Sequence, residues 1–99
     1  MPAMSALIDR PEALRFEQSV AAPGGGEAMV WADYAVQGTT RSLLHVEADQ
    51  ALRGSGAAGR FMTLLADHAR AEGLKLAPRC GYAVAWFRRN PDQADVLAQ

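Results

Sequence analysis

Three glycines stand at a spacing that suits the binding of a phosphorylated cofactor. The stretch RGSGAAG, residues 53–59, contains the pattern G-x-G-x-x-G in Gly54, Gly56 and Gly59. Glycines let the backbone approach a ligand closely and direct successive amides at one point. The loop opens a segment of helical periodicity, and a helix N-terminus attracts anions. Because Arg53 and Arg60 add full charges at either end, the stretch predicts a pyrophosphate cradle.

The same glycine pattern is the fingerprint of dinucleotide-binding folds, but its surroundings differ from such a fold. That fingerprint directly follows a strand inside a unit of parallel strands joined by a helix. Here the preceding segments predict hairpins, and residues 74–78, LKLAP, carry no acid to bind a ribose. No Gly-Lys-Ser/Thr follows the loop, so the Walker pattern also fails. The remaining alternative is a glycine-rich turn that only packs before a helix.

The hydrophobic pattern predicts the elements that would position this loop. Apolar and polar residues alternate in the first half of the chain, and short turns separate the alternating segments, as in antiparallel hairpins. From residue 57 onward apolar residues recur at helical spacing until Gly73, a good helix stop. The expected elements are strands at 14–20, 28–36, 41–48 and 74–78, and helices at 57–72 and 81–90. The sequence therefore predicts an α+β fold, with a mostly antiparallel sheet and the order β-β-β-α-β-α.

Length and composition restrict the class of protein. With 99 residues, we expect a flexible N-terminal lead-in at 1–13 and a single domain at 14–99. The net charge of -1 gives no reason to expect nucleic acid or an anionic membrane as a partner. The chain shows no signal-peptide pattern and no apolar run of the ~18–20 residues that span a membrane. A single cysteine, Cys80, excludes an internal disulfide, and the cytoplasm is the expected compartment. No metal site is expected, and the sequence leaves the oligomeric state open, with a monomer favoured.

The motifs of the chain resemble the GNAT superfamily of acetyltransferases. ALRGSGAAGRF is similar to its acyl-CoA loop, Gln/Arg-x-x-Gly-x-Gly/Ala, with Arg53, Gly56 and Ala58 at the matching positions. Other segments resemble a small subfamily, the NATD-like or YjdJ-like predicted acetyltransferases. These segments are RFE (15–17), HVEAD (45–49), ARAEGLKLAPRC (69–80) and RRNPDQADV (88–96).

The resemblance implies a compact GNAT-like fold with a splayed strand at the acyl-CoA site. The splayed strand would be LLHVEA (43–48), and its neighbour LKLAP (74–78). Acetyl-CoA or coenzyme A is the implied cofactor, and an amine on a protein lysine, an N-terminus or a polyamine is the implied acceptor. The cofactor-binding residues expected on this basis are Val46, Arg53, Gly54, Ser55, Gly56, Ala57, Ala58, Gly59, Arg60 and Asn90.

Glu47, His45 and Cys80 are the residues with which acyl transfer could be catalysed. Glu47 is the candidate base, directly or through water. His45 has the same strand parity, so both would share the cleft-facing side if Val46 faces the core. Cys80 would open the last helix, where a thiolate is favoured, and could carry a transient acyl group. The alternatives are solvated strand-end side chains for Glu47 and His45, and a small buried residue for Cys80.

The chain also departs from the subfamily pattern. HVEAD lacks a proline before the loop, Trp86 stands where relatives usually have tyrosine, and Asn90 stands where histidine is frequent. Tyr82 could protonate a leaving thiolate or could simply pack in the core. These departures motivate a second hypothesis, a non-catalytic CoA-binding or protein-interaction module with the same fold.

Overall fold

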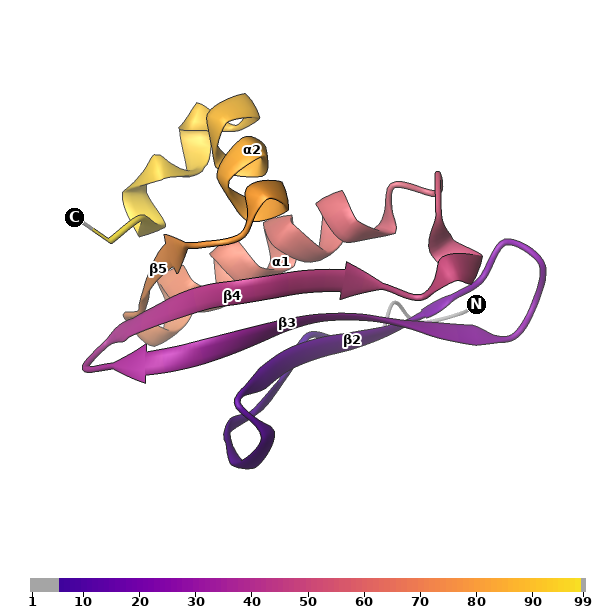
Figure 1. The fold of residues 1–99 in the computed structure, drawn as a ribbon, viewed down its shortest axis with the longest axis horizontal. Coiled ribbons are helices and arrows are strands. Elements are labelled where there is room, and N and C mark those ends of the chain that lie inside the picture. Colours follow the sequence, from indigo (N-terminus) through magenta and orange to yellow (C-terminus); the bar gives the residue numbers. More distant parts are fainter. Residues whose placement is uncertain (1–5, 99) are drawn as a thin grey trace.

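The computed structural model describes residues 6–98, which form a five-stranded sheet and two α-helices (Figure 1). The strands and helices are β1 (Ile8–Arg10), β2 (Arg15–Ala21), β3 (Glu27–Gln37), β4 (Thr40–Ala48), α1 (Ala57–Glu72), β5 (Lys75–Pro78) and α2 (Gly81–Arg89). Short 3-10 helices lie at Pro11–Ala13, Gln50–Leu52 and Pro91–Val96. The predicted α+β fold is thereby confirmed.

The strands lie in the order of the sequence, β1-β2-β3-β4-β5. The first three pairs are antiparallel hairpins, as the short turns predict. The pair β4–β5 is parallel, because α1 carries the chain back across the sheet between the two strands. The mostly antiparallel sheet of the sequence prediction is therefore present, with one parallel edge.

The N-terminal segment differs from the expected lead-in. Residues 8–10 form β1, which pairs with β2, and Tyr34 donates a hydrogen bond from its hydroxyl to Asp9 Oδ1 at 2.6 Å. Three residues are too few to show the alternation by which strands are recognised in a sequence. Residues 1–5 of the expected lead-in lie outside the described residues.

One face of the sheet carries the core. Along β3 the even-numbered residues Ala28, Val30, Ala32 and Tyr34 are buried, whereas the odd-numbered ones between them are only partly buried. Helix α1 buries Phe61, Met62, Leu65, Ala66 and Ala69 at helical spacing, and α2 adds Ala83, Trp86 and Phe87 to the same cluster. Burying each large apolar side chain stabilises the fold by about 1.5–3 kcal/mol. Both helices therefore pack on one side of the sheet (Figure 1).

Strand β4 separates from β5 halfway along its length. The two strands pair from Thr40 with Lys75 to Leu43 with Pro78, and β5 then ends while β4 continues to Ala48. Proline has no N–H with which to extend the ladder. At the same point a bulge leaves Leu44 without a counterpart on β3, and bulges bend a strand. Among residues 6–98, the second half of β4 thus has no strand partner on the β5 side, as predicted for a splayed strand.

Candidate functional site

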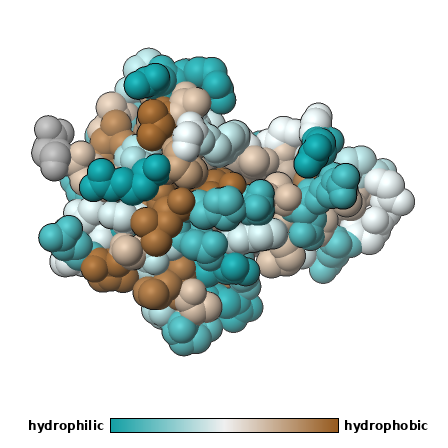
Figure 2. All heavy atoms as spheres, in the orientation of Figure 1, coloured by the Kyte–Doolittle hydropathy of each residue, from teal (hydrophilic) through white to brown (hydrophobic). Residues whose placement is uncertain are grey.

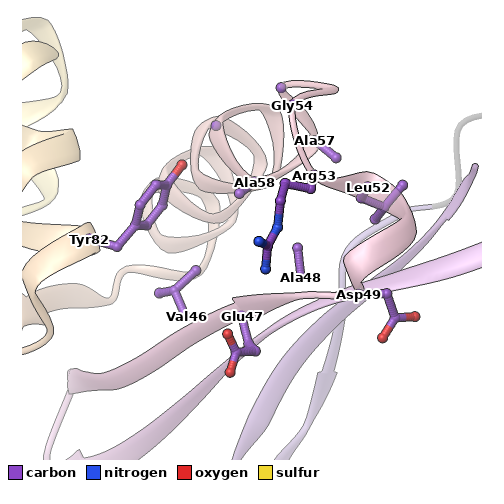
Figure 3. A pocket seen from close by; sticks show the side chains of 12 residues that line it. Val46, Glu47, Ala48, Asp49, Leu52, Arg53, Gly54, Ala57, Ala58 and Tyr82 are labelled. Atoms are coloured by element: carbon purple, nitrogen blue, oxygen red, sulfur yellow. The ribbon is translucent and has the colours of Figure 1, made fainter. Parts of the chain in front are cut away.

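A cavity of about 420 Å³ lies where β4 leaves β5 (Figure 3). The end of β4, the glycine loop, the first turn of α1 and the first turn of α2 enclose it. Its lining residues are Val46, Glu47, Ala48, Asp49, Leu52, Arg53, Gly54, Gly56, Ala57, Ala58, Gly59 and Tyr82. The glycine loop and the splayed strand of the sequence prediction therefore contribute to one site.

The glycine loop has a conformation that requires its glycines. Gly54 and Gly56 have φ values of +77° and +81°, in the left-handed region that favours glycine. A Cβ on Gly56 would also lie 3.1 Å from Arg60 Nη1. Ser55 fixes the turn, because its hydroxyl donates to Leu52 O at 2.6 Å and accepts from Ala57 N at 3.2 Å. The loop is thus built tightly against the start of α1.

Positive charge and helix amides face this part of the cavity. The first N–H groups of a helix have no partner within it, and Ala58 and Gly59 of the first turn line the cavity. Arg53 extends from the loop across the cavity toward β4 (Figure 3). Arg60 donates from Nη1 to Ser55 O at 3.0 Å, at the rim of the loop. These groups together suit a diphosphate.

The splayed half of β4 presents different residues to its two sides. Val46 and Ala48 point toward α1 and the cavity, whereas Glu47 points to the opposite side of the strand (Figure 3). His45 Nε2 lies 2.8 Å from Glu47 Oε2, and the two side chains are 54% and 49% exposed. The structure therefore brings the two predicted acid–base residues together, but on the side of the sheet that faces away from the helices and not on the cavity-facing side that the sequence predicted.

Tyr82 completes the wall of the cavity from α2. Its ring lies across from Val46, with the hydroxyl directed toward the start of α1 (Figure 3). Burial raises the pKa of the Tyr82 hydroxyl above its usual value, against a lowering by the charge of Arg89. The phenol is therefore protonated at neutral pH. Sequence reasoning gave Tyr82 only an optional role, because its place depends on how α2 packs on α1.

The other predicted residues lie outside the lining. Cys80 caps α2, where its Sγ accepts a hydrogen bond from Ala83 N at 3.4 Å. Asn90 closes the far end of that helix by donating from Nδ2 to Trp86 O at 2.8 Å. The lining residues that sequence reasoning missed are Ala48, Asp49 and Leu52. Asp49 accepts from Met29 N at 2.8 Å, a contact between distant residues that no local pattern reveals.

Comparison with known proteins identifies the family. The sequence model described as GCN5-related N-acetyl-transferase matches residues 15–96, most of the chain. The chain belongs to this family. A solution NMR structure of a GCN5-like predicted N-acetyltransferase from Staphylococcus aureus is similar to this GNAT domain, with a TM-score of 0.60 and 16% sequence identity. The match covers 98% of this chain and 91% of that one, and at this identity it shows the fold.

No curated protein matches the GNAT chain. Within residues 6–98 no helix is long and apolar enough to cross a membrane, and no three metal-ligating side chains converge. Members of the GNAT family use acetyl-CoA, which supplies an activated acetyl group when bound. The residues of the cavity are compatible with such a ligand, because its loop has glycines at two left-handed positions and lies between Arg53 and Arg60.

Proposed function

We propose that this chain binds acetyl-CoA in the cavity and transfers the acetyl group to an amine that approaches from the other side of β4. The observation that carries the proposal is the splay of β4. It opens the sheet at one strand, with the cavity on the helix side and Glu47 with His45 on the other. A donor and an acceptor could meet across that strand.

The donor side would bind the phosphates and the pantetheine arm. The amides of the first turn of α1 and the guanidinium of Arg53 complement the diphosphate. Arg60 can join them by exchanging its hydrogen bond to Ser55 O for one to a phosphate oxygen. The backbone of Val46, which has no partner on β5, can donate to the thioester carbonyl as negative charge develops on its oxygen.

The acceptor side would receive the amine. Glu47 takes a proton from the ammonium, directly or through water, and His45 holds the carboxylate by their hydrogen bond. The amine nitrogen then forms a bond to the carbonyl carbon and gives its second proton to solvent, while the carbon–sulfur bond breaks and CoA leaves as a thiolate. The thiolate takes a proton from solvent, and Glu47 loses its own proton to solvent.

The face around Glu47 is open. In the view of Figure 1 no helix lies in front of the strands, and Figure 2 shows hydrophilic side chains beside hydrophobic ones over them. Trp31 pairs with Glu47 across the strands, and the guanidinium of Arg15 lies 5.1 Å from its ring centroid. The Trp31 indole on this face therefore makes a cation–π contact with the guanidinium of Arg15, and an ammonium could make the same kind of contact. An uncovered face of this kind suits a protruding lysine, an N-terminus or a polyamine.

Calorimetric titration with acetyl-CoA, CoA and NAD tests the donor side. We expect both CoA forms to bind and NAD not to bind. Gly56→Glu should abolish CoA binding, because it adds a side chain at a left-handed position beside Arg60 and a negative charge in the cradle. Absence of CoA binding by the unaltered protein would reduce the loop to a packing turn.

Glu47→Gln tests the acceptor side. We expect turnover with an amine or peptide panel to fall by about 10²–10⁴-fold, with unchanged affinity for acetyl-CoA. Unchanged turnover in Glu47→Gln would show that Glu47 is not the general base.

The second candidate function is a CoA-binding module without catalysis. The observation in its favour is that both acid–base candidates are about half exposed, at 49% and 54%, since general bases are commonly tuned by burial. CoA binding by a protein that transfers no acetyl group to any amine or peptide would favour this function.

A further inference from the structure

Two polar atoms of α2 converge on one glycine of α1. A Cβ built on Gly59 would lie 3.9 Å from Trp86 Nε1 and 3.9 Å from Tyr82 Oη. Gly59 has an ordinary helical backbone, so its chain geometry does not require glycine. The absence of a side chain instead leaves a gap between the two helices, beside the cavity that Gly59 and Tyr82 line.

Among the described residues, the indole N–H at this gap has no hydrogen-bond partner. Trp86 is 5% exposed, and its N–H donates no hydrogen bond to any residue in the range 6–98. Trp86 Nε1 is not among the fully enclosed side-chain atoms without a partner in that range, so part of it is accessible to solvent. Indole is only a donor, so the group that replaces water at this N–H must be an acceptor. This arrangement points to an acceptor that arrives with a ligand.

Tyr82 supplies a second donor at the same place. Its hydroxyl makes no hydrogen bond to any side chain or backbone group of the described residues, and its raised pKa keeps the proton on the oxygen. The gap lies between the glycine loop, where phosphates would bind, and the splay of β4, where the acyl group would lie. It is thus placed along the intervening part of the ligand.

We propose that Trp86 N–H and Tyr82 O–H donate hydrogen bonds to a carbonyl oxygen of the pantetheine arm, and that Gly59 keeps the space for it. The inference rests on the proposed function, because it takes the ligand to be a CoA thioester. The arm carries neutral amide carbonyls, which are acceptors, whereas the phosphates have the arginines of the loop. An indole N–H does not transfer its proton in acyl transfer. Trp86 would therefore be a positioning residue, which binds the pantetheine arm of CoA and takes no part in the reaction.

Trp86→Phe tests the donor, because it removes the N–H and retains an aromatic ring. We expect the affinity for CoA to fall about tenfold or more. The affinity for the nucleotide half of CoA, a phosphorylated ADP without the arm, should stay the same. Unchanged CoA affinity, or an equal loss for both ligands, would overturn the inference and leave the proposed function standing. An unaltered protein that binds neither ligand would overturn the proposed function, and this inference with it.

Gly59→Ala tests the gap. Its Cβ makes only ordinary contacts, and alanine favours the helix, so thermal unfolding should move to a higher temperature. CoA binding should nevertheless weaken, while binding of the nucleotide half stays the same. Gly81→Ala is the matched control, since a Cβ there meets nothing within 4 Å, and it should leave CoA affinity unchanged. A stabilised Gly59→Ala protein with full CoA affinity would overturn the inference.

Discussion

The side chain of Tyr34, a buried residue of β3, makes a hydrogen bond to Asp9 of the edge strand β1. The residue is 2% exposed, and its hydroxyl donates to Asp9 Oδ1 at 2.6 Å. Burial, and then the hydrogen bond and charge of Asp9, raise the pKa of Tyr34 from 10.0 to about 12. The folded state therefore retains this proton at pH values where the unfolded chain has lost it.

Tyr34 should make the protein sensitive to alkali. Its stabilising contribution is complete below pH 10.0, and it is lost as the pH rises toward the folded pKa of about 12. The slope is about 1.4 kcal/mol per pH unit in that window, because the unfolded state binds fewer protons. Tyr34→Phe should be less stable at neutral pH by about 1–3 kcal/mol, from the lost bond to a carboxylate.

Chemical denaturation of both proteins on either side of pH 10.0 checks this prediction. The unaltered protein should lose more stability than Tyr34→Phe as the pH rises. Parallel losses in the two proteins would assign the alkaline transition to other groups.

At the scale of elements, α2 begins on a cysteine. Cys80 has an extended backbone, and its Sγ accepts from Ala83 N at 3.4 Å, in the manner of an N-cap. Sulfur is a weak acceptor, whereas a serine hydroxyl is among the best caps. The position therefore has a clear structural use apart from any reaction at the thiol.

Substitutions of Cys80 should separate capping from catalysis. We expect Cys80→Ser to match or exceed the unaltered protein in stability, and Cys80→Ala to be less stable by about 0.5–1 kcal/mol. Acetyl transfer should persist in both variants, because the thiol does not line the cavity. Thermal unfolding measures the effect on stability, and turnover measures the effect on catalysis. A loss of turnover in Cys80→Ser would support the hypothesis that the Cys80 thiol carries a transient acyl group.

The elements differ in how far the sequence reveals them. Helix α1 occupies 57–72 as predicted, because glycines bound it and its buried residues keep one helical period. The side of β4 on which Glu47 lies follows from strand parity. Strand β1 was missed because its three residues are defined by pairing rather than by pattern. The donors at Gly59 were also missed, since the angle between two helices is set by packing over the whole core.

At the scale of the molecule, the C-terminal segment fastens α1 to β5. Arg70 binds the carboxylate of Asp95 with Nε at 2.7 Å and Nη2 at 2.8 Å. Lys75 Nζ donates to Asp95 O at 2.6 Å, and Ala98 N donates to Leu76 O at 2.9 Å. This segment therefore holds β5 from the side opposite to β4, and so helps to fix the strand from which β4 splays.

Val96 should contribute more to this attachment than the ion pair does. Val96 is 2% exposed, so Val96→Ala should lower the free energy of unfolding by about 2 kcal/mol, from lost burial and a small cavity. Asp95→Asn should cost less, because exposed ion pairs contribute little. Arg70 lowers the pKa of Asp95, so this smaller contribution is present at neutral pH and is lost as the pH falls through the folded pKa.

Denaturation at low and high salt distinguishes the two contributions. The effect of Asp95→Asn should shrink in high salt, and that of Val96→Ala should not. A larger effect for Asp95→Asn than for Val96→Ala would show that the charge network dominates the attachment.

The two sides of β4 have a kinetic consequence under the proposed function. The donor would enter from the helices and the acceptor from the open face, so neither would block the other's path. Initial rates measured against both substrates should then give intersecting double-reciprocal lines, the mark of a ternary complex. Spent CoA could leave and fresh acetyl-CoA could load while a large acceptor stayed bound. One protein chain with several lysines could therefore be modified repeatedly in a single encounter.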